Sequence, residues 1–171
     1  MRRRRFLYWV LGITGGIALL GAGLTQLNPP PLIFNLSASL PRGLYFVRHV
    51  PTLERGMLVL VQPDKALENL LVTRGYLPAG VPLLKPVVAL TGDWVCVEDT
   101  EVSVNGAVLA TNVADVDSEG RLLPQWGECR VLAADEVFLL STHSEQSFDS
   151  RYFGPVASQS IVGTATLLWS W

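Results

Sequence analysis

The chain has 171 residues, of which 49% are apolar, and its formal net charge is −2. Arg2 to Arg5 supply four of the 13 basic residues, so the rest of the chain sets nine basic residues against 15 acidic ones. This acidic remainder excludes the broad basic surface that nucleic-acid binding needs, and we expect no nucleic-acid partner. The length suits one domain of ordinary size together with a membrane anchor.

A charge-free segment, residues 6–27, directly follows the four arginines. About 20 apolar residues are needed to cross the hydrocarbon core of a bilayer. Basic residues mark the cytoplasmic side of such a segment, and none follows until Arg42. We therefore predict a cytoplasmic basic segment (1–5), a transmembrane anchor (6–27) and an extracytoplasmic domain (28–171). A cleavable signal peptide is the alternative, because the Gly-Ala-Gly at 21–23 resembles a small-residue cleavage site.

Beyond the anchor, the sequence favours short strands separated by Gly/Pro turns. The clearest local signal is Asn105-Gly106 between two apolar arms, which is the preferred sequence of a type I′ hairpin turn. Together the signals predict a mostly β domain. The predicted strands are 44–50, 57–61, 94–97, the hairpin 102–109, 131–132, 136–140 and 161–169; the predicted helix is 64–71, and the predicted loops are 74–82 and 111–125.

Cys96 and Cys129 are the only cysteines, and both histidines lie far from them in the sequence. This set is poor for zinc, and we expect neither a metal nor a cofactor. An external domain lies in an oxidising compartment, where two lone cysteines tend to pair. We therefore predict a Cys96–Cys129 disulfide, with two unpaired buried cysteines as the alternative.

The stretch 35–45 places two hydroxyls, Ser37 and Ser39, in a short polar break shortly after the anchor. Pro41 disfavours a helical conformation of the residue before it, and Gly43 permits a tight turn or a close backbone approach. Taken alone, the stretch is typical of a juxtamembrane turn whose serines are solvated.

Lysine is scarce in this chain, with two lysines against eleven arginines. Lys65 lies at a polar helix start, where we expect it to be solvated. Lys85 lies inside an apolar run, 83–90, and burial should lower its pKa from a reference value near 10.4. A neutral lysine can accept the proton of a serine hydroxyl and so activate a nucleophile. The alternative is a lysine whose stem lies on apolar surface while its ammonium group reaches water.

A third stretch, 141–154, combines acidic, basic and hydroxyl side chains. Asp149 and Arg151 could pair and order a loop beside an active site, or form an exposed ion pair that contributes little. A Ser-His-Asp triad that includes His143 and Asp149 is conceivable. However, the sequence lacks the Gly-x-Ser-x-Gly elbow that often presents such a serine.

The three stretches, in this order, resemble the signal peptidase I family. Residues 37–41 (Ser-Ala-Ser-Leu-Pro) match its serine box, and residues 85–93 match its lysine box with Gly-Asp at the end. Residues 147–154 match its Asp-Ser-Arg-Tyr-x-Gly box. Leu40 replaces the methionine of the housekeeping enzymes, so the chain looks most like the short, single-anchor TraF-type peptidases of conjugative transfer.

The resemblance implies a fold and residue roles. The fold would be an arrangement of coiled β-sheets that follows a single transmembrane helix. Ser39 would be the nucleophile and Lys85 its general base, while Ser37 and the backbone N–H of Ser39 would form the oxyanion hole. Asp149 and Arg151 would support the site.

In addition, the resemblance implies that Ser147 can hydrogen-bond the lysine. It also implies a bacterial inner-membrane protein with one pass and a periplasmic catalytic domain. The substrate would be a precursor protein with small residues at the cleavage site, such as a pre-pilin, cut beside membrane lipid. A general signal peptidase I and a non-catalytic membrane-tethered scaffold of a secretion or pilus assembly are the alternatives.

Overall fold

The computed structural model describes residues 29–49 and 52–171. Within these ranges no helix is both long and apolar enough to cross a membrane. The predicted basic segment (1–5) and anchor (6–27) lie outside the described residues. The elements in chain order are β1 (Leu32–Asn35), β2 (Gly43–Arg48), β3 (Leu58–Val61), α2 (Lys65–Thr73), β4 (Leu83–Ala89), β5 (Trp94–Glu98), β6 (Glu101–Val104), β7 (Ala107–Ala110), β8 (Cys129–Val131), β9 (Glu136–Leu139), α3 (Ser150–Phe153), β10 (Val156–Ala157), the 3₁₀ turn η1 (Ser158–Ser160) and β11 (Ile161–Ser170).

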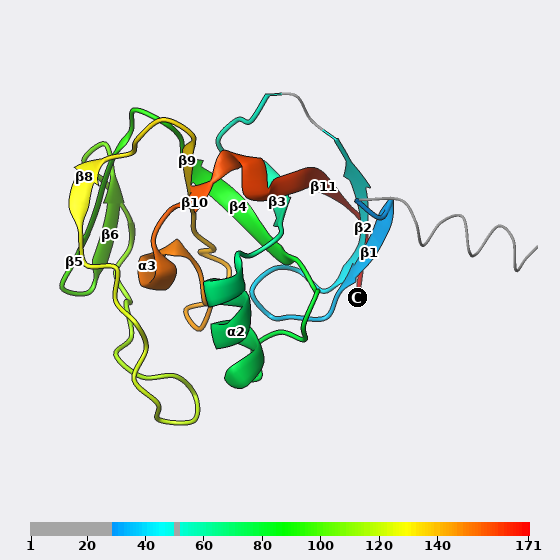
Figure 1. Cartoon of the computed structure of the whole chain (residues 1–171), viewed down its shortest axis with the longest axis horizontal. Helices are drawn as coiled ribbons and strands as arrows, with labels where there is room; N and C mark the ends of the chain where they lie inside the picture. Colours follow the sequence, from blue (N-terminus) through cyan, green and yellow to red (C-terminus); the bar gives the residue numbers. More distant parts are fainter. Residues whose placement is uncertain (1–28, 50–51) are drawn as a thin grey trace, which may run out of the picture.

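Two antiparallel sheets make up the domain, as the mostly β prediction requires. One sheet has seven strands in the order β1-β2-β11-β3-β4-β9-β10, and the other has four in the order β7-β6-β5-β8. Figure 1 shows the smaller sheet on the left and the strands of the larger sheet curving through the right half of the molecule. The long strand β11 returns the end of the chain to the sheet between β2 and β3.

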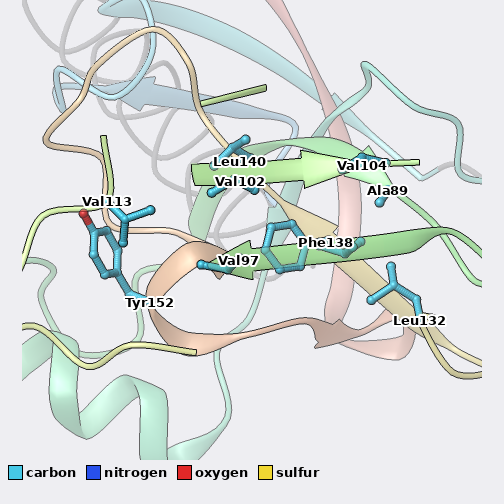
Figure 2. Packing of buried hydrophobic residues seen from close by; sticks show 10 residues of the cluster. Ala89, Val97, Val102, Val104, Val113, Leu132, Phe138, Leu140 and Tyr152 are labelled. Carbon is cyan, nitrogen blue, oxygen red and sulfur yellow. The ribbon is translucent and has the colours of Figure 1, made fainter. Parts of the chain in front are cut away.

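The core has three parts, and two of them lie near the strand β4. The first part fills the space between the smaller sheet and the strands β4 and β9; Figure 2 shows Phe138 at its centre and Tyr152 at its edge beside Val113. The second part packs α2 against β3, β4 and β9 through Leu71 and its neighbours. The third part lies under β2, β3 and β11 around Tyr45. Burial of these apolar side chains is the main force that holds the sheets together.

Strand β4 explains the apolar run of the second sequence stretch. Its side chains alternate between buried and half-buried from Leu83 to Ala89, because successive side chains of a strand point to opposite faces. Lys85 therefore faces the same side as Leu83 and Val87, which pack in the second core part. The sequence analysis did not predict this strand.

Several local predictions are confirmed. Asn105 and Gly106 both have positive φ, 50° and 82°, as a type I′ turn demands. Asp64 caps α2 by accepting a hydrogen bond from the N–H of Leu67. Gly43 allows a close backbone approach, since a Cβ atom there would collide with the carbonyl oxygen of Trp169.

The remaining differences from the predicted elements lie at short segments. Strand β1 and helix α3 were not predicted, and β8 covers Cys129–Val131 in place of 131–132. These elements have three or four residues, too few for hydrophobic periodicity to show in the sequence. The predicted loop 111–125 contains one isolated bridge, between Val116 and Leu122. The predicted disulfide is confirmed: Cys96 and Cys129 lie opposite each other on β5 and β8 and are bonded.

Candidate active site

Lys85 lies on β4 with 4% of its surface exposed. Its Nζ donates a 2.8 Å hydrogen bond to the hydroxyl of Ser147, which is also buried. Burial lowers the pKa of Lys85 to about 8; the negative charge of Asp149 opposes this shift, and the positive charge of Arg151 adds to it. The whole side chain is buried, so the alternative of an amphipathic surface lysine is wrong. Near pH 8 this amine can both accept and release a proton.

Ser37 and Ser39 lie on the loop that joins β1 to β2, with their hydroxyl oxygens 3.0 Å apart. Asn35 organises this loop from within. Its Oδ1 accepts hydrogen bonds from the N–H and the hydroxyl of Ser37, and its Nδ2 donates to the carbonyls of Ser37, Leu40 and Pro41. Ser37 is exposed and Ser39 half-buried, as expected of a turn, but the buried Asn35 gives the loop a defined shape.

Ser39 and Lys85 border the same cavity, whose volume is about 1100 Å³. In the described part of the chain, no hydrogen bond joins the Ser39 hydroxyl to Lys85 Nζ. The Ser39 hydroxyl is paired with the hydroxyl of Ser37, and Lys85 Nζ is paired with that of Ser147. Hydrogen bonds of a catalytic pair are often long without substrate and tighten when substrate binds. The structure therefore brings Ser37, Ser39, Lys85 and Ser147 to one cavity.

Asp149 and Arg151 form an ion pair inside the protein, with side-chain exposures of 0% and 2%. Arg151 donates to both carboxylate oxygens of Asp149, at 2.7 and 3.0 Å. Arg151 Nη2, which donates the 3.0 Å bond, also donates a 2.8 Å hydrogen bond to the carbonyl of Ser141, and the N–H of Ser141 donates a 3.0 Å bond to Asp149. The alternative of an exposed, weak ion pair is therefore wrong. The pair fixes the chain on both sides of the loop that carries Ser147.

His143 does not belong to this arrangement. Its side chain is exposed, and among the described residues no hydrogen bond connects it to Asp149, whose carboxylate is occupied by Arg151 and Ser141. The Ser-His-Asp alternative is therefore wrong. Lys65 is exposed at the start of α2, as predicted, and does not border the cavity.

Two segments that were predicted as loops also line the cavity. The segment after α2 contributes Tyr76, Leu77 and Pro78, and the segment after β7 contributes Val116 and Asp117. The hydroxyl of Tyr76 donates a 2.5 Å hydrogen bond to Asp117, which joins the two segments. These residues are mainly apolar, and they border the same cavity as the serine loop.

Two residues of the site, Asn35 and Ser141, were missed by the sequence analysis. The hydroxyl of Ser141 donates to the backbone carbonyl of Ser39. Asn35 is the first residue of the stretch 35–45, so an asparagine two residues before a serine was an available signal for a side chain that organises a turn. For Ser141 the sequence offers no such signal, because its partner lies 102 residues away.

A family model and several known proteins are similar to this chain over most of its length. The family model described as "Signal peptidase, peptidase S26" matches residues 7–171. The plasmid transfer protein TraF of Escherichia coli is 32% identical over 179 aligned residues, which cover all of both chains. The conjugal transfer protein TraF of Agrobacterium tumefaciens is 34% identical, with 96% of each chain covered.

More distant matches include a signal peptidase I sequence and a solved structure. Signal peptidase I of Leptolyngbya laminosa is 29% identical over 66% of this chain and 51% of that protein. A crystal structure of a signal peptidase I from Enterococcus faecalis aligns with a TM-score of 0.42 at 20% identity, covering 68% of this chain and 99% of that one.

Proposed function

Because the chain belongs to the signal peptidase family, peptidase S26, we propose that it is a membrane-anchored serine endopeptidase with a Ser39/Lys85 dyad. It removes the leader peptide of an exported precursor. The observation that carries this proposal is the buried amine of Lys85, with its lowered pKa, on the cavity that also holds the Ser39 hydroxyl. The other lysine, Lys65, is exposed and does not border this cavity, so Lys85 is the lysine suited to the task.

The reaction follows from the properties of these groups. Neutral Lys85 takes the proton of Ser39 as the hydroxyl oxygen attacks the scissile carbonyl. The resulting ammonium group then gives a proton to the leaving amine, and the acyl-enzyme ester on Ser39 is cleaved by water. Ser147 holds the lysine amine in place throughout, since its hydroxyl accepts a hydrogen bond from Nζ.

The oxyanion requires donors beside Ser39, and the hydroxyl of Ser37 is the side chain in reach. In the substrate-free arrangement this hydroxyl donates to Asn35 Oδ1 at 2.8 Å. A hydroxyl rotates easily, so its hydrogen can turn from Asn35 to the developing oxyanion while the N–H of Ser37 still holds Asn35. The backbone N–H of Ser39 supplies the second donor.

The sheet offers a place for an extended substrate. Strand β4 pairs with β3 from Leu83 to Pro86, but its pairing with β9 begins only at Val87. Among the described residues, the first half of β4 therefore has a strand partner on one side only. Leu83, Leu84 and Lys85 border the cavity. An extended precursor segment can add to this free edge, where its scissile bond would meet Ser39.

An exposed apolar face supports a site close to membrane lipid. Leu32 and Phe34 on β1 lie opposite Phe46 and Leu44 on β2, so these side chains share one face of the sheet. Phe34 is 67% exposed, and Trp169 on β11, opposite Leu44, is 62% exposed. Figure 1 shows the C-terminus beside β1 and β2. We propose that this face meets the lipid surface, where tryptophan is favoured.

The predicted topology remains part of the proposal: residues 1–5 inside the cell, 6–27 across the inner membrane and the domain in the periplasm. The Cys96–Cys129 disulfide supports an oxidising compartment. Protease treatment of spheroplasts should degrade the domain and leave a short fragment with the N-terminus. A domain released without the first 27 residues would contradict the anchor and favour a cleaved signal peptide.

The transfer functions in the names of the relatives suggest the substrate. Their names contain "plasmid transfer" and "conjugal transfer", and we propose that this chain processes a pilin or another transfer component. The acyl-enzyme can react with water or with an amine of the same substrate, which would join its ends. Co-expression with candidate pre-pilins and intact-mass analysis tests both points. A mass one water lower than that of the cleaved chain means cyclisation; an uncut pre-pilin would contradict the substrate.

A further inference from the structure

We propose that Ser141 is a positioning residue for the nucleophile. Its hydroxyl holds the backbone carbonyl of Ser39 and thereby fixes Ser39 relative to Lys85. The inference rests on the proposed Ser39/Lys85 mechanism. Ser141 has no exposed surface and Ser39 is half-buried, so the donor of this hydrogen bond lies inside the protein and its acceptor lies at the cavity.

The bond from Ser141 differs from all other hydrogen bonds found for the serine loop, residues 36–41. The bonds from Asn35, Ser37 and Tyr45 to this loop connect positions no more than six residues apart. They preserve the shape of the loop but do not fix its place in the domain. The bond from Ser141 connects positions 102 residues apart, at the nucleophile itself.

Ser141 is firmly held at its other end. Its N–H donates to Asp149 and its carbonyl accepts from Arg151, so both backbone groups bind the buried ion pair. The hydroxyl is the part of Ser141 that remains to reach the serine loop. The ion pair therefore acts on the nucleophile through Ser141.

The same segment also fixes the strand of the lysine. The N–H of Leu140 donates 3.1 Å to the carbonyl of Pro86, the neighbour of Lys85. Two successive residues thus bind the lysine strand and the serine loop. Segment 140–141 sets the separation of Ser39 and Lys85, the two groups that must exchange a proton.

Loss of the Ser141 hydroxyl should affect the chemical step. A displacement of reacting groups by about 1 Å can cost on the order of 10²-fold in rate. We expect Ser141→Ala to lower kcat on the order of 10- to 10²-fold while KM stays close to the native value, since the cavity walls are unchanged. Ser141→Thr keeps the hydroxyl and should recover most of kcat.

Ser150 provides a matched control. It is also a fully buried serine, and its hydroxyl accepts a hydrogen bond from the N–H of Leu139 at 3.0 Å. Among the described residues, no hydrogen bond joins Ser150 to the serine loop. Ser150→Ala loses one buried hydrogen bond, as Ser141→Ala does, and should keep its kcat. Thermal unfolding of each variant shows which ones fold.

The experiment uses the full chain in detergent micelles. The probe is a purified precursor with a hydrophobic segment, an Ala-Ser-Ala site and a reporter domain, and kcat and KM are measured for each variant. Hydrogen exchange of the peptide that covers residues 36–42 gives a second readout that needs no turnover. We expect faster exchange there in Ser141→Ala and native exchange in Ser150→Ala.

The outcomes separate this inference from the proposed function. If Ser39→Ala cleaves the probe, or the native enzyme does not, the Ser39/Lys85 mechanism on this substrate fails, and the exchange rates alone decide whether Ser141 holds the loop. If the native enzyme cleaves and Ser141→Ala matches it, the positioning role is wrong. A kcat loss that Ser150→Ala reproduces, or a folded Ser141→Thr as slow as Ser141→Ala, also overturns it.

Discussion

The amine of Lys85 donates a 2.8 Å hydrogen bond to the hydroxyl of Ser147, a residue 62 positions further along the chain. The bond is buried, and it joins the strand β4 to the loop that precedes α3. It gives the lysine a fixed orientation towards the cavity, because a single hydroxyl acceptor replaces the water that an exposed amine would bind.

Activity should rise with pH as Lys85 loses its proton. The pKa of Lys85 is about 8, so at pH 7 about one molecule in ten carries the neutral amine that can act as a base. We expect kcat/KM to increase about tenfold per pH unit below this pKa and to level off above it. The measurement is a pH–rate profile of the full chain on a precursor. A profile governed only by a group that titrates near pH 6.5 would contradict the lysine base and return a histidine to consideration.

Lys85→Arg should be as inactive as Lys85→Ala. Arginine keeps the positive charge but stays protonated, so it cannot accept the proton of Ser39. Ser39→Ala should match both variants, and the double variant should lose little more, because residues of one catalytic unit are not additive. Lys65→Ala, the matched control, should process substrate normally. Cleavage in membranes, with expression matched by immunoblot, tests this; substantial turnover by Lys85→Arg would refute the assignment.

Lys85→Met should stabilise the protein at neutral pH. The lysine pKa falls from 10.5 in the unfolded chain to about 8 in the folded one. Between pH 8 and pH 10.5 the unfolded state binds more protons than the native state, so the free energy of unfolding rises with pH in this range. Below pH 8 the native state carries the full cost of burying the charged amine. We expect a gain of about 1–3 kcal/mol at pH 7, after the loss of one hydrogen bond to Ser147.

Denaturant unfolding at pH 7 and pH 10 measures this effect. The advantage of the methionine variant should shrink at the higher pH, because native Lys85 is then neutral. Lys65→Met is the control, since this exposed side chain should change stability little at either pH. A methionine variant less stable than the native chain at pH 7 would contradict a charged, buried Lys85.

Arg151→Met should destabilise the fold strongly. Its removal leaves the fully buried carboxylate of Asp149 without its cation, a change that typically costs about 3–5 kcal/mol. Arg48 is exposed on β2, and Arg48→Met should cost much less. Equal free energies of unfolding for the two variants would show that the buried ion pair contributes no more to stability than an exposed arginine does.

Loss of the Cys96–Cys129 disulfide should lower stability and spare catalysis. The bond joins residues 33 positions apart, and the chain-entropy model assigns such a link about 3–4 kcal/mol. It lies on the smaller sheet, while Lys85 lies on the larger one. Unfolding with and without reductant, and of the Cys96→Ser/Cys129→Ser variant, measures the difference. A lower turnover rate of the folded Cys96→Ser/Cys129→Ser variant at 25 °C would contradict this prediction and show that the two sheets are coupled.

The sequence alone predicted the parts of this protein that depend on near neighbours. The Asn105-Gly106 turn, the cap of α2 and the mostly β character depend on residues a few positions apart, where backbone preferences act directly. The pairing of Cys96 with Cys129 needed only the count of cysteines and the expected compartment. Of the side chains that the three boxes singled out, Ser37, Ser39, Lys85 and Ser147 border one cavity.

The tertiary structure decided the contacts that cross the domain. The sequence left the Asp149–Arg151 pair open between an exposed and a site-ordering role, and only the assembled sheets show that it is buried. The hydroxyl of Ser141 on the carbonyl of Ser39 had no local signal, because its partner comes from the other end of the domain. Local preferences act over a few residues, whereas burial and long-range hydrogen bonds exist only after β4 and β9 have paired and brought these segments together.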